Sequence, residues 1–362
     1  MNGDLRRVTL KDIAERTGYS LTSVHRAMTN KDGVSKTVRD EILTAAHNMG
    51  YTTNYVASAL KRKQMNIAIV LPESEVYGKY YFSYFWKGIH DYASEISGYN
   101  IQILEFPFAC TNEGEEQHQL QKLAEVYQSW GTQLDGLLTT PVSNDSVLES
   151  ALRRFVQTGT QVVLIDNDFP NCGRLCCIAP NDHNTGRLSA ELMSSLLPKK
   201  EGTVLVAAGD PTSFSHRLNA EGFENYLRKH APYLHVLSVA DPVSKQNYHH
   251  TLAHIIEQHP DIVAGYSVRA RNTIPLCRAA RESGRLQNMC LLGSDLFPES
   301  AELLRHGILK GIVYKNPYQK GYLGLKTLFE YLIKGRAPKS SAIHVTISVI
   351  LQTNLVFFEE FL

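Results

Sequence analysis

Short apolar runs alternate with helix-forming segments from residue 66 onward. Such runs include 66–72 (NIAIVLP), 161–168 (QVVLIDND) and 289–295 (MCLLGSD). Strands that alternate with helices typically form parallel sheets covered by helices on both faces. Two successive series occur, so we predict an α/β core of two doubly wound lobes.

The core is expected to bind a small molecule between its lobes. The predicted lobe boundaries are 66–165 plus 296–325, and 166–295 plus 326–362. In doubly wound folds, ligands bind outside the carboxyl ends of the strands, and a cleft between two lobes is a natural small-molecule site.

Residues 1–51 follow a different pattern, that of three short helices. Thr9 is expected to cap the first helix and Gly18 to end it. Ser20 is expected to cap the second helix and Ser35 the third, which Gly50 ends. A helix, a tight glycine turn and a second helix within about twenty residues are typical of a helix-turn-helix.

The second helix has an inner face that can pack and an outer face with no packing role. Val24, Ala27 and Met28 recur at helical spacing on the inner face. The outer face carries polar or exposed side chains, namely Ser20, Leu21, Thr22, His25 and Arg26. In a helix-turn-helix the start of this helix meets base edges in the major groove, so the face predicts a DNA contact.

Charge supports the same interpretation. Residues 1–65 hold 11 Lys and Arg against 6 Asp and Glu, a net charge of +5, whereas the remaining 297 residues carry −4. A basic head on a mildly acidic body indicates a polyanionic partner for the head alone. A three-helix module that contacts another protein is the alternative.

Residues 52–65 (TTNYVASALKRKQM) predict a hinge helix and linker. Asn54 can cap a short helix, and Leu60 protrudes beside small residues as an apolar wedge for the minor groove. Such a short helix is marginal alone and would need a partner helix and a nucleic-acid surface. A plain basic linker is the alternative.

The stretch VTLKDIAERTGYSLTSVHRAMTN, together with VSKTVRDEILTAAHNMGYTTNYVASAL, resembles the head and hinge of the lactose-repressor (LacI/GalR-type) family of bacterial transcription regulators. The resemblance implies base contacts by Leu21, Thr22 and Arg26. It implies backbone contacts by Ser20, Ser23 and Asn54, and a minor-groove wedge at Leu60. His25 stands where the family usually has serine.

The core resembles the same family's regulatory domain, a periplasmic-binding-protein-like fold with three crossovers. The resemblance rests on the order of elements and on short stretches such as LLGSD and KNPYQKGYLGLKTL. The candidate ligand-binding residues are Tyr81, Phe82, Asp166, Asn181, Arg217, Asn219, Arg269 and Asp295. Arg269 and Lys315 stand at normally neutral positions, which suggests an acidic or phosphorylated ligand.

The resemblance further implies a repressor of carbohydrate or related metabolic genes that acts as a homodimer on double-stranded operator DNA. A sugar or related metabolite in the cleft would switch the affinity for DNA by changing the dimer state. A metabolite-binding protein whose head contacts protein is the main alternative, and a two-lobed enzyme is the other.

Several classes of protein find little support. No dinucleotide, Walker, GxSxG or HExxH motif is present, so we expect no enzyme and no cofactor. His250 and His254 have i, i+4 spacing that can bind metal, but a solvated helix face is the preferred interpretation. Six cysteines, no bilayer-spanning apolar run and no leader-like start suggest a cytoplasmic protein without a membrane partner.

Overall fold

The computed structural model describes residues 8–28, 32–51, 63–75, 78–109, 115–241 and 247–362. The chain divides into two compact units, Met1–Lys61 and Arg62–Leu362, which are described separately below as the head and the core. The predicted hinge helix, with Asn54 and Leu60, lies outside the described residues.

The head contains three helices, α1 (Leu10–Thr17), α2 (Leu21–Met28) and α3 (Lys36–Asn48). Thr9 and Asp12 form a reciprocal capping box at the start of α1, and Gly18 ends this helix in the left-handed conformation. Ser35 caps α3 through the amide of Val38. The predicted helix starts and stops are therefore confirmed.

A small apolar core holds the three helices together. Its fully buried members come from all three helices and are Ile13, Val24, Ala27, Ile42 and Ala46. Because α2 uses Val24 and Ala27 for this contact, its opposite side remains exposed.

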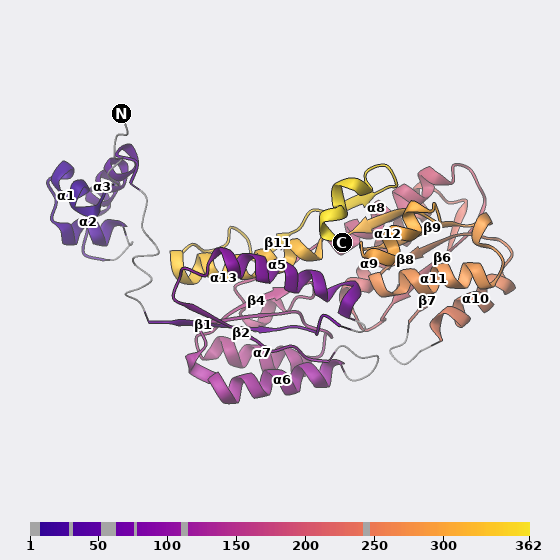
Figure 1. Cartoon of the computed structure of the whole chain (residues 1–362), viewed down its shortest axis with the longest axis horizontal. Coiled ribbons are helices and arrows are strands. Elements are labelled where there is room, and N and C mark those ends of the chain that lie inside the picture. The colour runs from indigo at the N-terminus through magenta and orange to yellow at the C-terminus, as the bar shows by residue number, and fades with distance from the viewer. Residues whose placement is uncertain (1–7, 29–31, 52–62, 76–77, 110–114, 242–246) are drawn as a thin grey trace. The chain divides into compact units, whose positions relative to one another are not determined.

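The first lobe of the core is a six-stranded parallel sheet with strand order β11-β5-β4-β3-β1-β2. Its strands are β1 (Met65–Val70), β2 (Ile101–Glu105), β3 (Gly136–Thr139), β4 (Gln161–Ile165), β5 (Cys176–Ala179) and β11 (Ala342–His344). Helices α5 (Phe82–Glu95) and α13 (Pro317–Lys334) cover one face, and α6 (Glu115–Trp130) and α7 (Ser146–Gln157) cover the other (Figure 1).

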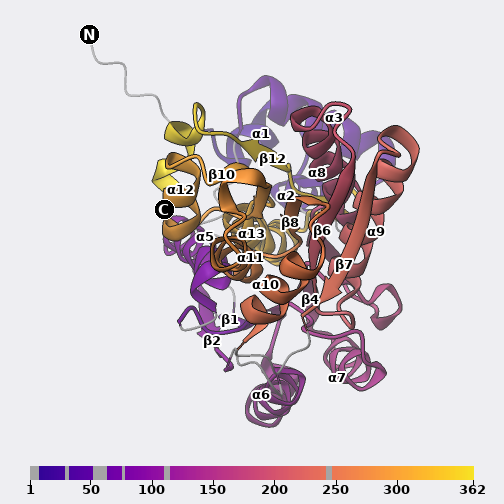
Figure 2. The same ribbon diagram turned by 90° about the vertical axis from the view of Figure 1, so that its right-hand side faces the viewer.

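The second lobe repeats this architecture with strand order β12-β10-β9-β8-β6-β7, in which only β12 runs antiparallel to its neighbour. Its strands are β6 (Gly202–Gly209), β7 (Leu234–Ala240), β8 (Ile262–Ser267), β9 (Cys290–Ser294), β10 (Leu309–Tyr314) and β12 (Ser348–Ile350). Helices α8 (Asp182–Leu196) and α9 (Phe214–His230) pack on one face. Helices α10 (Tyr248–Gln258), α11 (Ala270–Glu282) and α12 (Pro298–Arg305) pack on the other (Figure 2).

Short 3-10 helices complete the core. They are η1 (Gly78–Tyr80), η2 (Gly131–Gln133), η3 (Pro170–Cys172), η4 (Leu286–Asn288) and η5 (Leu355–Phe361). The predicted α/β class and the two doubly wound lobes are confirmed by this arrangement.

The lobe boundaries differ from the predicted ones. The chain crosses between the lobes after β5, after β10 and after β11, since β5, α13 and β11 belong to the first lobe and β10 to the second. The prediction placed 166–179 and 326–344 in the second lobe and 296–316 in the first, and these assignments are wrong. The four-residue β5 carries two cysteines and was not recognised as a strand that pairs with β4.

Each lobe contains one helix pair that approaches backbone to backbone through glycine. A Cβ atom on Gly88 in α5 would lie 2.2 Å from the carbonyl oxygen of Tyr318 in α13, and one on Gly321 would lie 2.2 Å from that of Phe85. In the second lobe, Gly222 of α9 stands equally close to α8, 2.1 Å from the His183 carbonyl oxygen. Larger residues at these positions would separate the helices.

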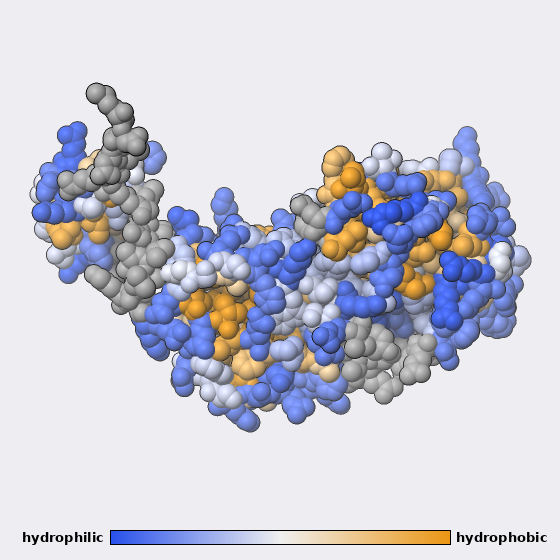
Figure 3. All heavy atoms as spheres, viewed as in Figure 1, coloured by the Kyte–Doolittle hydropathy of each residue, from blue (hydrophilic) through white to orange (hydrophobic). Residues whose placement is uncertain are grey.

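The surface of the core is mostly polar. Figure 3 shows hydrophilic residues over much of the visible face, interrupted by apolar patches. Val356 and Phe357 in η5 are 60% and 76% exposed. Among the described residues, no helix combines the length and the apolar character that a membrane crossing requires.

Candidate functional site

The outer face of α2 is the candidate DNA-contacting surface of the head. Leu21 is 53% exposed, and Thr22, His25 and Arg26 are also exposed. The hydroxyl of Ser20 accepts the amide hydrogen of Ser23 at 3.1 Å, which fixes the start of the helix. The structure therefore groups all six described residues of the predicted DNA set on one short helix and its cap.

The other end of α2 is held by α3. The Arg39 guanidinium donates to the carbonyl oxygens of Arg26 and Ala27, at 3.3 Å each. These carbonyls belong to the last turn of α2, where backbone acceptors have no partner within the helix. Helix α2, which carries the outer face, is therefore held at its start by the Ser20 cap and at its end by Arg39.

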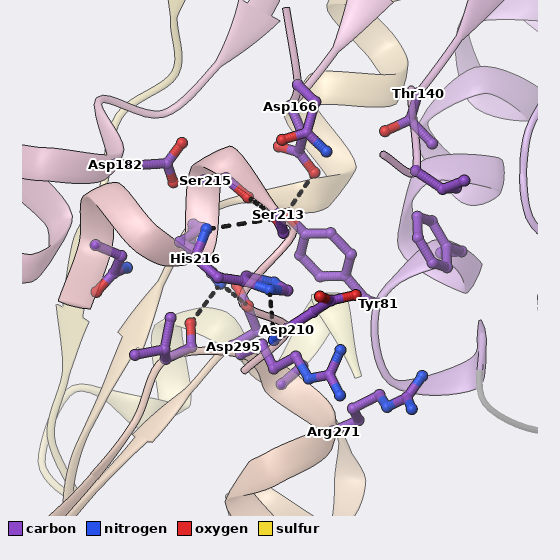
Figure 4. Close-up of a pocket in the computed structure, with 18 of the residues that line it drawn as sticks. Tyr81, Thr140, Asp166, Asp182, Asp210, Ser213, Ser215, His216, Arg271 and Asp295 are labelled. Atoms are coloured by element: carbon purple, nitrogen blue, oxygen red, sulfur yellow. Dashed lines mark hydrogen bonds and ion pairs between the residues drawn. The ribbon is translucent and has the colours of Figure 1, made fainter. Parts of the chain in front are cut away.

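The candidate ligand site of the core is a pocket between the two lobes (Figure 4). It encloses about 940 Å³, including space open to solvent. First-lobe residues in its lining are Tyr80, Tyr81, Phe82, Glu115, Thr140, Pro141, Val142, Asp166 and Asn167. Second-lobe residues and the connectors supply Asp182, Asp210, Ser213, Ser215, His216, Asn219, Val268, Arg269, Ala270, Arg271, Asp295 and Lys315.

Six of the eight predicted ligand residues line this pocket, namely Tyr81, Phe82, Asp166, Asn219, Arg269 and Asp295. The other two do not. Asn181 caps α8 by accepting the amide hydrogen of Asn184 at 3.0 Å. Arg217 is exposed on α9, with its guanidinium 5.3 Å from the ring centre of Phe214. Both residues have local structural roles that sequence spacing alone did not distinguish from ligand contact.

In the first lobe, Asp166 is the centre of a hydrogen-bonded cluster. It follows β4 in the left-handed conformation, with φ of 63°. The Lys320 ammonium lies 2.6 Å from its Oδ1 atom, and the Tyr81 hydroxyl donates to its Oδ2 atom at 2.9 Å. Lys320 also donates to the Tyr81 hydroxyl oxygen. The Tyr81 ring at the pocket wall is therefore oriented by a buried ion pair.

In the second lobe, Asp295 occupies the corresponding position after β9, with φ of 57°. Its Oδ1 atom accepts the backbone amide of Lys315 at 3.0 Å, and its Oδ2 atom lies 3.1 Å from the Lys315 ammonium. That ammonium donates to the carbonyl oxygen of Val268 at 3.2 Å. The buried Oδ2 atom accepts no geometrically sound hydrogen bond from any described residue.

A second buried acceptor is found on the first-lobe side. Asn167 donates its amide to the carbonyl oxygen of Pro141 at 2.7 Å, while its Oδ1 atom is buried without a hydrogen bond from the described residues. Buried acceptors without donors cost free energy. The pocket is therefore suited to a ligand that supplies several hydrogen-bond donors.

Each basic side chain in the lining faces a carboxylate. Arg269 is paired with Asp241, and its Nε atom donates to Asn272 at 3.2 Å. Arg271 of α11 lies 3.7 Å from Glu115 of α6, in the other lobe. Because Lys315 is paired with Asp295 as well, the positive charges at the pocket are balanced within the protein.

Two further lining groups have altered protonation. Burial, with the nearby charge of Asp166, raises the pKa of Asp182 to about 7. Burial, with the charges of Arg269 and Lys315, holds the pKa of His216 well below its usual value. His216 Nδ1 accepts the amide hydrogen of Asp210 at 3.2 Å, so the neutral ring carries its proton on Nε2.

Contacts between the lobes surround the pocket. In addition to Arg271 and Glu115, Lys79 lies 3.0 Å from Glu299. The rings of Tyr80 and Phe297 meet edge to face, with centroids 4.8 Å apart. Any opening of the lobes must break or rearrange these contacts.

Cys176 and Cys177, adjacent buried thiols of β5, lie apart from each other in the fold. Cys176 and Cys177 point to opposite faces of β5, into the two separate apolar clusters of the first lobe. Burial raises the pKa of Cys176 to about 11, so its thiol stays protonated near neutral pH.

Comparison with known families gives one match for each unit. The family of bacterial regulatory proteins of the lacI type matches residues 9–54, and the periplasmic binding protein domain matches residues 67–337. The chain therefore belongs to the periplasmic binding protein domain family through its core, and it carries a lacI-family helix-turn-helix domain as its head. Helix α2 is thus the second helix of a lacI-type head, and the pocket lies in a periplasmic-binding-protein-like core.

The individual relatives compared with this chain are distant. The HTH-type transcriptional regulator DegA of Bacillus subtilis (strain 168) is 27% identical over 169 residues, which is 45% of each chain. The D-allose-binding periplasmic protein of Escherichia coli (strain K12) is 22% identical over 257 residues, 68% of this chain and 80% of that protein.

Solved structures confirm the fold of the core. A protein described as a LacI transcriptional regulator from Bacteroides fragilis superimposes with a TM-score of 0.71 at 18% identity. The match covers 82% of this chain and 99% of that one.

Several lining residues escaped the sequence analysis. Asp182, Ser213, Ser215, His216 and Arg271 come from helix starts whose distance from the pocket depends on how the strands are ordered. Lys320, which holds Asp166, lies 154 residues away from it in sequence. The only signal for it was its place in the KNPYQKG stretch, one turn into α13.

Proposed function

We propose that the chain is a ligand-responsive, sequence-specific DNA-binding transcription regulator that represses carbohydrate or related metabolic genes in the cytoplasm. One observation carries the proposal: a lacI-type head with an exposed α2 face shares a chain with a two-lobed core that contains a polar pocket. We further propose a homodimer, because each head would read one half of a near-palindromic operator.

The chemistry of α2 suits the major groove. Leu21 can contact a thymine methyl group, Thr22 can hydrogen-bond a base or a phosphate, and Arg26 can donate to guanine. Ser20 and Ser23, at the helix start, are suited to phosphate contacts that set the register. His25 extends the same face. The net positive charge of residues 1–65 supports binding to a polyanion.

The pocket supplies the switch. An effector that contacts both lobes changes the free energy of one lobe arrangement relative to another, and hence the spacing of the two heads in a dimer. Residues 52–65, with Asn54 and Leu60, are proposed to form a hinge that orders on DNA. The coupling is reciprocal, so operator DNA must change the effector affinity by the same factor.

We propose an uncharged, polyhydroxylated effector rather than the acidic or phosphorylated one that Arg269 and Lys315 suggested from sequence. Both of these cations face carboxylates, and the pocket lining carries further acceptors in Asp166, Asp182 and Asp210. Hydroxyl groups can satisfy such acceptors, and Tyr81 and Phe82 can pack against a sugar ring. A D-allose-binding relative of the core is consistent with this class.

The deciding experiment selects bound sequences from a random double-stranded DNA pool with the purified full-length chain, with and without a library of neutral and phosphorylated sugars. We expect a twofold-symmetric motif whose enrichment one neutral sugar changes. Arg26→Ala should relax the preference at one position of each half-site. Arg228→Ala, at an arginine in α9 of the core, is the matched control and should leave the motif unchanged.

Other outcomes would redirect the proposal. No enriched motif under any condition would assign the head to a protein partner and leave a metabolite-binding protein as the function. A response to phosphorylated sugars alone would contradict the uncharged effector while leaving DNA binding in place.

A further inference from the structure

A cluster of two histidines and one glutamate joins α10 to α11 in the second lobe. His249 and His250 lie in the first turn of α10, and Glu282 is the last residue of α11. One ligand-capable atom from each side chain lies within 4.8 Å of the other two. The sequence had drawn attention to His250 and His254 instead, which share only a helix face.

His249 is the unusual member of this cluster. Only 9% of the residue is exposed, and its Nε2 atom is buried without a hydrogen bond from any described residue. A buried imidazole nitrogen without a hydrogen-bond partner lowers the stability of the fold unless a ligand or an ion binds to it. That nitrogen lies 3.7 Å from the Oε1 atom of Glu282.

The spacing of the three side chains matches the coordination shell of a small metal ion. His250 Nδ1 lies 3.6 Å from the Oε2 atom of Glu282, and the two imidazole rings have centroids 4.0 Å apart. Two ligand atoms of a tetrahedral zinc ion lie about 3.4 Å apart, given bonds of about 2.1 Å. The three groups therefore need only small movements to share one ion.

We propose that His249, His250 and Glu282 bind a divalent transition-metal ion of the zinc class, with the fourth position open to water. Two imidazoles and one carboxylate suit Zn²⁺ or Ni²⁺ better than Mg²⁺ or Ca²⁺, which prefer oxygen ligands. The ion would fasten the start of α10 to the end of α11. None of the three residues lines the pocket, so the site stands apart from the proposed effector switch.

A neighbouring cation, Arg278, competes with a metal ion for the Glu282 carboxylate. Arg278 Nε donates to Glu282 Oε1 at 2.8 Å, and its side chain is 59% exposed, so it can turn into solvent when an ion binds. Burial and the Arg278 charge lower the pKa of His249, which favours the neutral imidazole that metal binding requires. His254 lies outside the cluster, and its Nε2 atom forms a hydrogen bond with the Nε2 atom of Gln258 at 2.9 Å.

The test titrates Zn²⁺ into the reduced, tag-free, full-length chain against a chromophoric chelator. We expect one ion per chain, with affinity reduced more than tenfold by Glu282→Gln and by His249→Ala. His254→Ala and His259→Ala remove other histidines of the same region and should leave the affinity within twofold. Glu282→Gln keeps the side-chain shape, so it tests the site even if His249→Ala fails to fold.

A gain of affinity provides a second measure. Arg278→Ala removes the cation that competes for Glu282 and should strengthen zinc binding several-fold, whereas an unchanged or weaker affinity would contradict this position for the ion. Absence of zinc binding by the wild-type chain, or equal affinity in Glu282→Gln, overturns the proposal. Loss of binding in His254→Ala would assign the ion to the helix face instead. A strong thiolate band with Co²⁺ would assign it to cysteine.

Discussion

The two lobes use the same pair of residue types in two different ways. Each ends a central strand with an aspartate in the left-handed conformation and sets a buried lysine beside it. In the first lobe the Asp166 and Lys320 charges are 2.6 Å apart, and Tyr81 completes the carboxylate. In the second lobe the Lys315 ammonium lies 3.1 Å from Asp295 Oδ2, an oxygen that accepts no hydrogen bond of good geometry from the described residues.

The two carboxylates therefore differ in how many protein groups they bind. Each oxygen of Asp166 accepts one hydrogen bond, and these bonds fix the Tyr81 ring. The second keeps an acceptor at the pocket wall. Lys315 directly follows β10 and Lys320 lies in the first turn of α13, so the two lysines stand at either end of the connector that passes from one lobe to the other. The connector is therefore fastened to each lobe by an ion pair.

The largest loss of stability is expected from breaking the Lys320–Asp166 ion pair of the first lobe. Lys320→Met leaves the Asp166 carboxylate without its buried partner and should lower the free energy of unfolding of the core by about 3–5 kcal/mol. Urea denaturation followed by circular dichroism measures the loss. Lys326→Met, at a partly exposed lysine of the same helix, is the control and should change stability by less than about 0.5 kcal/mol. Equal losses would show that the Lys320 pair has no special role.

Altering the other pair should affect both stability and the effector. Asp295→Asn leaves the buried Lys315 ammonium without its carboxylate, which lowers stability, and should weaken effector binding by about 1.5–3 kcal/mol, roughly 10- to 100-fold. Titration calorimetry with the selected effector measures this change. Asp168→Asn alters a nearby carboxylate that pairs with Arg174 outside the pocket lining and serves as the control. An effector affinity that Asp295→Asn does not change would remove this residue from the site.

The helix pairs test whether both lobes are equally rigid. Gly321→Ala and Gly222→Ala should each lower the free energy of unfolding by about 1–3 kcal/mol, because the new methyl group meets backbone atoms about 2 Å away. Gly98→Ala has open space around it and should be close to neutral. Thermal unfolding of the three variants checks this order. A large loss at only one of the two crossings would show that the lobes differ in packing.

The smallest effect concerns Asp182, whose pKa of about 7 reflects burial and the charge of Asp166 across the pocket. Between about pH 4 and pH 7 the folded chain holds a proton here that the unfolded chain has lost, so stability decreases as the pH rises through this range. Asp182→Asn should remove that slope and raise stability at pH 8 by about 1–2 kcal/mol. Glu201→Gln, at an exposed carboxylate, should not. Unfolding curves measured at several pH values give the slope of stability against pH. An unchanged slope in Asp182→Asn would contradict the raised pKa of Asp182.

Local patterns in the sequence accounted for the head and for most of the core. Capping residues such as Thr9 and Ser35 act within one helix turn, so their effects can be deduced from neighbouring residues. Strands β1 and β4 contain continuous apolar runs of four residues. By contrast, β5 is short and contains Cys176 and Cys177, and its place beside β4 depends on pairing that no local pattern encodes.

The pocket was predictable only in part, for a related reason. Asp166 and Asp295 follow strands directly, and such strand ends meet at one edge of a sheet. Asn181 also stands at an element boundary, but its side chain caps α8. The distinction between a cap and a ligand contact depends on which atoms come within hydrogen-bonding distance. Lys320 pairs with a residue far away in the chain, and no spacing rule relates the two.

The glycine crossings limit how this molecule can move. Helices whose backbones touch cannot slide past one another without a clash, so these two crossings resist shear within each lobe. Motion between the lobes would then be concentrated in the three short connectors after β5, β10 and β11. A joint of this kind has few degrees of freedom, so the proposed signal from the pocket would travel as one rotation rather than as a diffuse loosening.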